Sequence, residues 1–555
     1  MLVTVLYKIL FLFLFFVNLS FCENNIVEKY EFREDESHKN IAPQLHPKSH
    51  INIFLPSIPY SYIAKATNSG LIRSHDNEQT WVYELAKSHE RIDDFTYIFE
   101  LRQNLKFQNG EDFTMEDVVY NLNYFQKYPF LYTNIDKIDF DVIPIDKYKF
   151  KIVLKQKYEM FLTDLARIYF YTKEYLDTYK PVGKETGTAN KAAGAFGMGP
   201  YILKEGFAMG EQQTQKLELE ANPYYWNSEF PKIKSITAYT ELDIDTAIED
   251  ITKTEGKLDF VPIPFNKKLD IILSPYAKLI VSKSTDNIVI FFNLINGNKS
   301  LQNKEIRQAL NQALNQENLL NFVYKKEGRI SPFAASLNYS IVNKIAEKYT
   351  YEETKMSEDE IYKHLNGLSL NIFTQDSFMF LLKGIEFQLK KYGVVFNYTI
   401  TNSEKDIYNQ LLNTNKNTNT KNWDLLVWGD DDWYYQNPWT VFFIYEGSSA
   451  WSTIGKDDLM QEYIEKYFVT KVESPQYEEL TKNILYRAKN MAYSLIVPSP
   501  NKVIAVNKEL IYKPYEGGII PLWEIQITNN HWSIRDKKEY DDHLKKSLKA
   551  LRIVE

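Results

Sequence analysis

The feature of this sequence that most restricts its fold is an alternation of apolar strands and amphipathic helices between Leu368 and Gly429. Leu368–Gln375 (LSLNIFTQ) has the length and composition of a buried strand. A helix follows over Ser377–Gly393, with Ser377 as its predicted cap and Gly393 at its end. The apolar face of this helix comprises Phe378, Leu381, Leu382, Ile385 and Leu389.

The same alternation continues with a strand (VVFNYTIT), a helix (SEKDIYNQLLN) and a third strand (WDLLVWG). A strand–helix–strand–helix–strand order predicts parallel strands with helices packed on the faces of the sheet. The sequence therefore predicts an α/β fold.

Three consecutive aspartates, Asp430, Asp431 and Asp432, follow the third strand between Trp428 and Trp433. Like charges in a row repel one another, and neighbouring aromatic rings strengthen that repulsion. In open α/β sheets, ligands lie outside the carboxyl ends of the strands, which is where this triplet falls. It is either a hydrated turn that caps backbone amides or a site for a cationic group.

A chain of 555 residues exceeds one ordinary hydrophobic core, so we expect at least two lobes. The net charge is −8, and no run of lysine and arginine provides the basic surface that nucleic acid requires. We therefore expect no nucleic-acid partner.

The N-terminus carries an apolar run, Ile9–Val17, after Lys8. This run is too short for a comfortable membrane span and has the length of a signal-peptide core, so we expect export. The only cysteine, Cys22, follows in LSFC, which is similar to a bacterial lipoprotein attachment site, although Phe21 stands where a small residue is usual. Lipidation at Cys22 and plain cleavage nearby both remain open.

Several ordered stretches resemble the solute-binding proteins of ABC importers, specifically the peptide- and nickel-binding family (family 5). The first is Asp93–Phe125, in which Gly110 permits a tight turn and Thr114 and Asp117 form a capping-box-like pair before Val118, Leu122 and Phe125. Gln108-Asn109 replaces the family's usual His-Asp there.

Further stretches of the resemblance are GMGPYILKEG (197–206), ANPYYWNSEFPKIKSI (221–236), IEDITKTEGKLDF (248–260) and IVIFFNLINGNKSLQNKEIRQALNQALNQENLL (288–320). A single Gly-x-Gly is weak evidence, but this ordered series, over roughly residues 75 to 525, is specific. The resemblance implies a two-lobed periplasmic-binding-protein-like fold (type II), with mixed sheets, flanking helices and a hinge of two crossing strands.

The expected organisation follows from this resemblance. Residues 1–22 form a signal peptide or lipoprotein signal, and 23–48 a tether. Residues 49–287 form the first lobe, with an inserted subdomain at about 75–170, and 288–505 form the second lobe. Residues 506–555 return to the first lobe and end in a tail. The two crossings are expected near Ile288–Leu294 and Ile496–Val506.

The resemblance also gives the acidic triplet a role. In the family's peptide-binding members, an aspartate after a Trp-bearing strand pairs with the α-ammonium of the peptide. Side chains alternate along a strand, so only some of the three aspartates face a ligand. Spacing from Trp428 favours Asp431, followed by Asp430, with Trp428 or Trp433 as a wall of the pocket.

Metal and enzyme chemistry find little support in the sequence. Of the histidines, only His46 and His50 (HPKSH) have ligand-like spacing, and Pro47 disfavours a shared helical face, so a solvated segment is expected there. No nucleophile elbow, phosphate-binding loop or dinucleotide fingerprint occurs. We expect no metal site and no cofactor.

The resemblance therefore predicts a non-enzymatic, monomeric receptor in the periplasm that delivers a short peptide or peptide-like solute to an ABC permease. Its only membrane contact would be a lipid anchor. A nickel-chelate or metallophore receptor of the same family is the alternative, and a secreted hydrolase is a third hypothesis.

Overall fold

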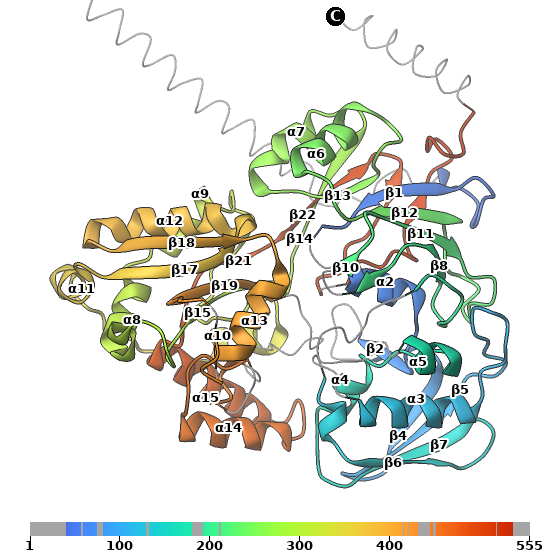
Figure 1. Cartoon of the computed structure of the whole chain (residues 1–555), viewed down its shortest axis with the longest axis horizontal. Helices are drawn as coiled ribbons and strands as arrows, with labels where there is room; N and C mark the ends of the chain where they lie inside the picture. Colours follow the sequence, from blue (N-terminus) through green and yellow to red (C-terminus); the bar gives the residue numbers. More distant parts are fainter. Residues whose placement is uncertain are drawn as a thin grey trace, which may run out of the picture.

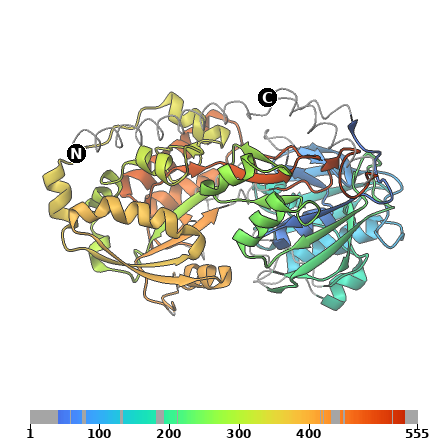
Figure 2. The same ribbon diagram turned by 90° about the horizontal axis from the view of Figure 1, so that it is seen from above.

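The computed structural model of the chain describes residues 40–56, 59–74, 81–128, 133–179, 192–209, 212–414, 416–419, 421–430, 444–447, 451–517 and 519–536. These residues form two lobes side by side, as Figures 1 and 2 show from the front and from above. The first lobe holds a seven-stranded and a four-stranded sheet, and the second a five-stranded sheet. The predicted two-lobed α/β fold with mixed sheets and flanking helices is thus confirmed.

The seven-stranded sheet has the order β14-β22-β13-β1-β12-β11-β8. Its strands are β1 (His50–Phe54), β8 (Tyr201–Glu205), β11 (Lys216–Ala221), β12 (Ser235–Tyr239), β13 (Phe260–Pro262), β14 (Ala277–Ser282) and β22 (Lys502–Asn507). Central β1 is parallel to β12 and β13, and its Ile51 and Ile53 are fully buried. Helices α2 (Pro59–Thr67), α6 (Ile244–Lys253) and α7 (Lys268–Ile272) lie around this sheet.

The four-stranded sheet is antiparallel, in the order β4-β5-β7-β6. Its strands are β4 (Ala86–Arg91), β5 (Thr96–Leu101), β6 (Phe140–Pro144) and β7 (Lys149–Leu154), with helices α3 (Met115–Lys127), α4 (Phe161–Leu165) and α5 (Lys173–Tyr179) nearby. Helix α3 starts as predicted, because the Asp117 carboxylate accepts hydrogen bonds from the backbone N–H (2.8 Å) and hydroxyl (2.7 Å) of Thr114. Gly110 before it has φ +89°.

The five-stranded sheet confirms the predicted parallel unit. Its order is β18-β17-β19-β15-β20, and β17 is parallel to both β18 and β19. The strands are β15 (Asn287–Phe292), β17 (Ser369–Gln375), β18 (Val395–Thr401), β19 (Leu425–Asp430) and β20 (Ser494–Leu495). The helices of this lobe are α8 (Lys304–Gln312), α9 (Gln316–Phe322), α10 (Ser340–Lys348), α11 (Glu358–Leu365), α12 (Met379–Leu389), α13 (Glu404–Thr414), α14 (Asp458–Phe468) and α15 (Pro475–Met491).

Two local predictions are wrong. Ser377 does not cap α12, because a 3₁₀ turn over Asp376–Phe378 leads into the helix and leaves Ser377 exposed inside the turn. His50 is not part of a solvated segment, because it opens β1 and its ring nitrogens contact Ser235 and Asn52. Gly393 does end the helical segment, with φ +78°.

The chain passes between the lobes twice. It leaves β14 at Ser282 and enters β15 at Asn287, and it returns from β20, which ends at Leu495, to β22 at Lys502. The returning segment forms β21 (Ser499–Pro500), which pairs with β16 (Gly328–Arg329). The remaining short pairs are β2 (Ile72–Ser74) with β3 (Trp81–Tyr83), β9 (Ala208–Met209) with β10 (Gln212–Gln213), and β23 (Leu510–Ile511) with β24 (Gln526–Ile527).

Among the described residues, the lobes touch near the crossings and at the end of α14. Near the crossings, the rings of Phe265 and Tyr324 lie 5.3 Å apart, and Lys268 of α7 forms an ion pair with Glu327. Elsewhere, the ring of Tyr158 stacks on that of Phe468, the last residue of α14, at 5.8 Å. One cluster of buried apolar side chains runs from the four-stranded sheet into the five-stranded sheet. The two lobes therefore pack against each other in the described residues.

Candidate functional site

Two of the predicted ligand residues, Trp428 and Asp430, lie in the last part of β19, at one edge of the five-stranded sheet. Because β17, β18 and β19 are parallel, they end at the same edge, at Gln375, Thr401 and Asp430. Strand β15 runs the other way, so its first residue lies there too, with Asn287 opposite Asp430. This is the edge at which α/β folds bind ligands.

Trp428 lies beside this edge and is packed rather than freely presented. Its side chain is 4% exposed, and its ring stacks on that of Trp451 with centroids 5.4 Å apart and planes 18° apart. The next residue, Gly429, lies close to Phe378, because a Cβ atom added to Gly429 would be 3.6 Å from the Phe378 ring. The end of β19 thus lies among packed aromatic rings.

The other predicted ligand residues are only partly covered. Asp430 is the last residue of β19 and pairs through its backbone with Asn287. Asp431, Asp432 and Trp433 lie outside the described residues, and so does Cys22. Their roles remain predictions, and Trp428 is the one predicted side chain whose position is described.

A polar connection at the same edge was not predicted from the sequence. The side-chain amide of Asn287 donates to the carbonyl of Ala334 (3.0 Å), and the hydroxyl of Ser499 donates to Oδ1 of Asn287 (3.2 Å). These contacts bring the start of β15, the loop after β16 and the returning strand β21 together beside the end of β19. Asparagine and serine carry no distinctive sequence signal, and Trp451 lies outside any strand pattern, so sequence reasoning missed them.

In the first lobe, the loop between β7 and α4 reaches the end of α14, which belongs to the second lobe. The backbone N–H of Glu159 donates to the carbonyl of Phe468 (2.8 Å). Two nitrogens of Arg91 donate to the Glu159 carboxylate at 2.6 and 2.7 Å, and these bonds raise the pKa of Arg91 above its usual range. The ion pair fixes the loop that touches the second lobe.

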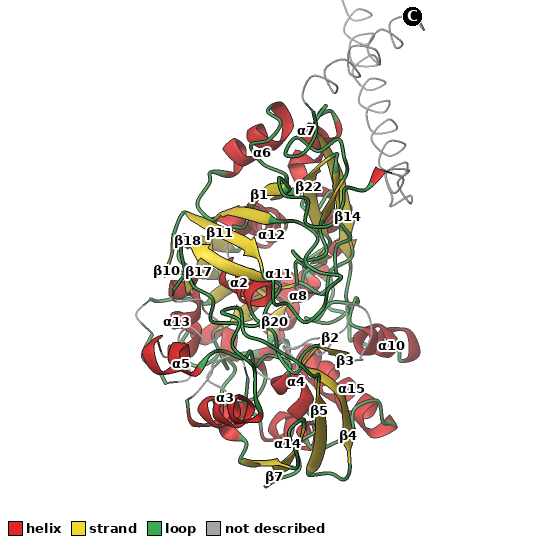
Figure 3. Cartoon of the chain, turned by 90° about the vertical axis from the view of Figure 1, so that its right-hand side faces the viewer, coloured by secondary structure: helices red, strands yellow, loops and turns green. Residues whose placement is uncertain are grey.

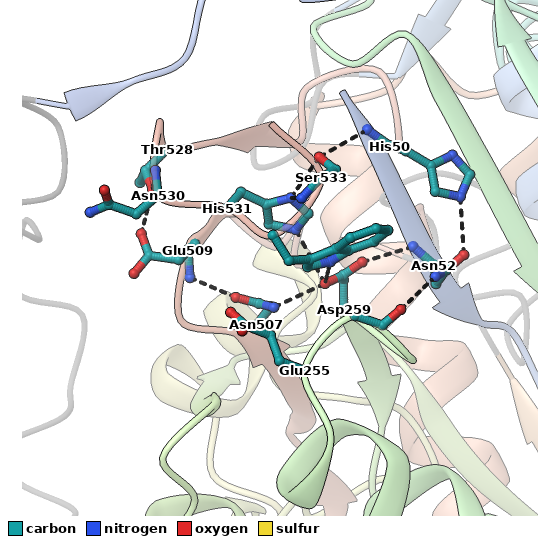
Figure 4. Close-up of polar contacts among 12 residues, drawn as sticks. His50, Asn52, Glu255, Asp259, Asn507, Glu509, Thr528, Asn530, His531 and Ser533 are labelled. Atoms are coloured by element: carbon teal, nitrogen blue, oxygen red, sulfur yellow. Dashed lines mark hydrogen bonds and ion pairs between the residues drawn. The ribbon is translucent and has the colours of Figure 1, made fainter. Parts of the chain in front are cut away.

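A second polar cluster lies in the first lobe, centred on Asp259 (Figure 4). The buried Asp259 carboxylate accepts hydrogen bonds from the backbone N–H of Asn52 (2.8 Å), the amide of Asn507 (3.0 Å) and the indole of Trp532 (2.8 Å). Nε2 of His531 lies 3.2 Å from the same carboxylate. These contacts join β1, the entry to β13, the end of β22 and the segment around residue 531.

The order Asp259–His531–Ser533 is similar to that of a hydrolase triad, but burial argues for a structural role. The backbone N–H of Ser533 donates to Nδ1 of His531 (3.3 Å), so the ring carries its proton on Nε2, toward Asp259. Asp259 and His531 both have an exposed fraction of 0%. We infer that this cluster stabilises the first lobe.

Within the described ranges, no group of three or more His, Cys, Asp or Glu side chains is arranged to hold a metal ion. Among the helices of those ranges, none is both long enough and apolar enough to cross a bilayer.

We call the edge at which β17, β18 and β19 end the ligand edge. Together with the two lobes and the two crossings between them, it makes this fold that of an α/β binding protein. The sequence pattern described as "Bacterial extracellular solute-binding proteins, family 5 Middle" matches residues 80–452. The chain belongs to this family of bacterial extracellular solute-binding proteins.

Individual similar proteins differ in what their names say they bind. The glutathione-binding protein GsiB of Escherichia coli (strain K12) is 28% identical over 349 residues, which cover 60% of this chain and 63% of GsiB. The chain thus spans less than two thirds of that relative's length.

Two solved structures share the fold. NikA from Staphylococcus aureus in complex with Ni(L-His)2 has a TM-score of 0.69 and 18% identity, and the match covers 86% of this chain and 100% of NikA. The oligopeptide-binding protein AppA from Bacillus subtilis in complex with a nonapeptide has a TM-score of 0.69 and 17% identity, covering 88% and 100%.

Proposed function

We propose that this protein is an extracytoplasmic receptor that binds a short peptide or peptide-like solute between its lobes and delivers it to an ABC transporter permease. Membership of the solute-binding family supports the receptor role. GsiB and AppA, which are named for glutathione and oligopeptide binding, support the peptide class. The observation that carries the proposal is that β19, whose Trp428 stacks on Trp451, ends on the ligand edge at Asp430, the first residue of the acidic triplet.

The chemistry of this edge suits a peptide with a free amino terminus. The α-ammonium is cationic below about pH 8 and needs a carboxylate when it is removed from water. One aspartate of Asp430–Asp432 would supply that charge, and the packed tryptophans would keep the strand end fixed. A carboxylate held in place loses little conformational freedom when the ligand arrives.

The ligand class is tested by calorimetry with four probes: glutathione, a free tetrapeptide, the same tetrapeptide N-acetylated, and Ni²⁺ with two equivalents of histidine. We expect the free peptide to bind and the acetylated one to bind at least tenfold more weakly. Binding of nickel–histidine alone would instead favour the nickel-chelate alternative, for which the similarity to NikA is the supporting observation. Binding of none of the probes would contradict the proposal.

We also propose that the protein binds without turnover and acts as a monomer. Peptide recovered intact after long incubation with equimolar protein is the expected result, whereas cleavage products would favour the hydrolase hypothesis. Light scattering should give the mass of one chain with and without peptide.

Anchoring at Cys22 in the periplasm is a separate proposal, which rests on the apolar run before the only cysteine. Mass spectrometry of the mature protein should show an N-terminal cysteine carrying diacylglycerol. A mature chain that starts elsewhere without lipid would contradict the anchor and leave a soluble exported protein.

A further inference from the structure

A groove in the first lobe lies apart from the ligand edge of β19. It is an open cavity of about 860 Å³ between α3, α5 and the turn that follows β6. Figures 1 and 3 both show α5 beside α3, and Figure 1 shows these helices in the lobe opposite β19. The volume falls within the range of small-molecule sites, roughly 300–1,000 Å³.

Helix α3 presents different faces to the core and to the groove. Its Val118, Leu122 and Phe125 are buried on the core side. Its Tyr120, Tyr124 and Tyr128, spaced four residues apart, line the groove. The ring centroids of Tyr120 and Tyr124 are 6.5 Å apart and those of Tyr124 and Tyr128 are 4.6 Å apart. We call these three side chains the tyrosine ladder.

The ladder already attracts cations from the chain itself. Lys173 lies over the ring of Tyr120 at 5.1 Å, and Lys127 lies over that of Tyr128 at 5.3 Å. The face of a tyrosine ring is electronegative and draws ammonium groups to about 6 Å or less. Among the described residues, no lysine or arginine lies over the central ring, that of Tyr124.

The charges around the groove favour a cationic ligand. Glu116, Asp146 and Asp177 line it, whereas Lys127 is the only lysine or arginine among the described lining residues. The hydroxyl of Tyr120 donates to the Asp177 carboxylate, which keeps this carboxylate beside the ladder. Even with Lys173 at the rim, carboxylates outnumber ammonium groups three to two, so a cation is attracted and an anion repelled.

Tyr124 has an unused polar group. Its side chain is only 8% exposed, and its hydroxyl makes no hydrogen bond to any residue that the structure describes. Burial raises the pKa of Tyr124 to about 12, so the hydroxyl stays neutral at physiological pH. A buried hydroxyl without a partner is unfavourable, and a ligand that hydrogen-bonds to it gains from that.

We propose that this groove binds a primary organic ammonium with an apolar body, at a second site independent of the solute at the β19 edge. The ammonium lies against the tyrosine ladder, and a movement of the Tyr124 side chain brings its buried hydroxyl oxygen within reach of one ammonium N–H. The apolar body packs on Val119 and Ile145. Glu116, Asp146 and Asp177 balance the charge of the ligand.

Calorimetry on the full chain with three probes of one shape tests this proposal. The probes are 2-phenylethylammonium, its N,N,N-trimethyl derivative and 2-phenylethanol. We expect the primary ammonium to bind about tenfold more tightly than the neutral alcohol. The alcohol has no positive charge, so it makes no cation–π contact with the tyrosine rings and is not attracted by the carboxylates. The trimethyl cation, which has no N–H, should fall between them.

Tyr124→Phe keeps the ring and removes the hydroxyl, so it should abolish the preference for the primary over the trimethyl cation. Glu116→Gln with Asp146→Asn should weaken both cations about tenfold and leave the alcohol unchanged. Glu249→Gln removes an exposed carboxylate on α6, outside the groove, and serves as a charge control that should have no effect. Thermal melting checks that each variant is folded.

Failure of the primary ammonium to bind at millimolar concentration would overturn the proposal. So would a Tyr124→Phe protein that keeps the preference for the primary cation. Peptide binding at the β19 edge is measured separately, through substitutions at Asp430–Asp432, so either site can fail without the other.

Discussion

At the scale of single residues, the proposed peptide contact is tested at Asp430, the last residue of β19, and at Asp431 and Asp432, which follow it in the sequence. If one of them pairs with the peptide ammonium, removing its charge leaves a buried unpaired cation, which typically costs about 2–5 kcal/mol, or roughly 30-fold to several thousand-fold in affinity. We therefore expect one of Asp430→Asn, Asp431→Asn and Asp432→Asn to weaken peptide binding sharply and the others to do little.

Calorimetry with a free peptide measures this effect. The N-acetylated peptide should bind the wild type more weakly than the free peptide does, and its affinity should be the same for the wild type and for the sensitive variant. Equal affinity in all three variants would mean that the triplet is a hydrated turn and that the ligand is held elsewhere.

Residue chemistry also explains what could be predicted about this site. The strand pattern placed Trp428 and Asp430 at the end of β19, beside the ends of β17 and β18, whereas Asp431 and Asp432 lie outside the described residues. The stacking of Trp428 on Trp451, and the link from Asn287 to Ser499, join residues far apart in the sequence. No periodicity encodes such contacts, because they arise only when the sheet and the crossing strands are assembled.

At the scale of elements, periodicity predicted the parallel unit well and the helix entry poorly. Apolar runs fixed β17, β18 and β19, and the capping pair Thr114–Asp117 fixed the start of α3. Ser377 is a suitable cap by residue type, but Asp376, Ser377 and Phe378 form a 3₁₀ turn, so α12 begins only at Met379. His50 was misplaced because its partners, Ser235 and Thr237, lie in β12.

Helices α10 and α15 are joined by a charged contact with a predictable pH response. Lys344 and Lys348 of α10, together with Tyr349, hydrogen-bond to the Glu478 carboxylate of α15 and lower its pKa from about 4.5 to about 2. Because the folded pKa lies below the unfolded one, the stabilisation is present above about pH 4.5 and is lost as the pH falls toward 2.

We therefore expect Glu478→Gln to lower the melting temperature at pH 6, and the difference from wild type to vanish near pH 2. Glu479→Gln, which removes the neighbouring and more exposed carboxylate, should change little at any pH. A constant difference between wild type and Glu478→Gln from pH 6 to pH 2 would contradict the assignment to titration.

At the scale of the whole molecule, the contact of Tyr158 with Phe468 favours the closed arrangement of the lobes. Phe468→Ala removes an aromatic pair worth about 0.5–1.5 kcal/mol, so the unliganded protein should open more often and have a larger radius of gyration. Ligand affinity should fall by up to about tenfold, since the ligand must then drive more of the closure.

Small-angle scattering with and without peptide measures the change, and wild type should be smaller when peptide is bound. Phe387→Ala is the control, because that ring is 82% exposed on α12. An unchanged radius in Phe468→Ala, together with unchanged affinity, would show that the contact does not govern closure.

The way the chain is shared between the sheets has a consequence for the order of folding during synthesis. The five-stranded sheet takes all its strands from residues 287–495, so it can assemble as soon as that stretch is available. The seven-stranded sheet must wait for β22, and the Asp259 cluster must wait for Asn507, His531 and Trp532. The lobe that the ribosome begins first is therefore the one that the nascent chain can complete only last.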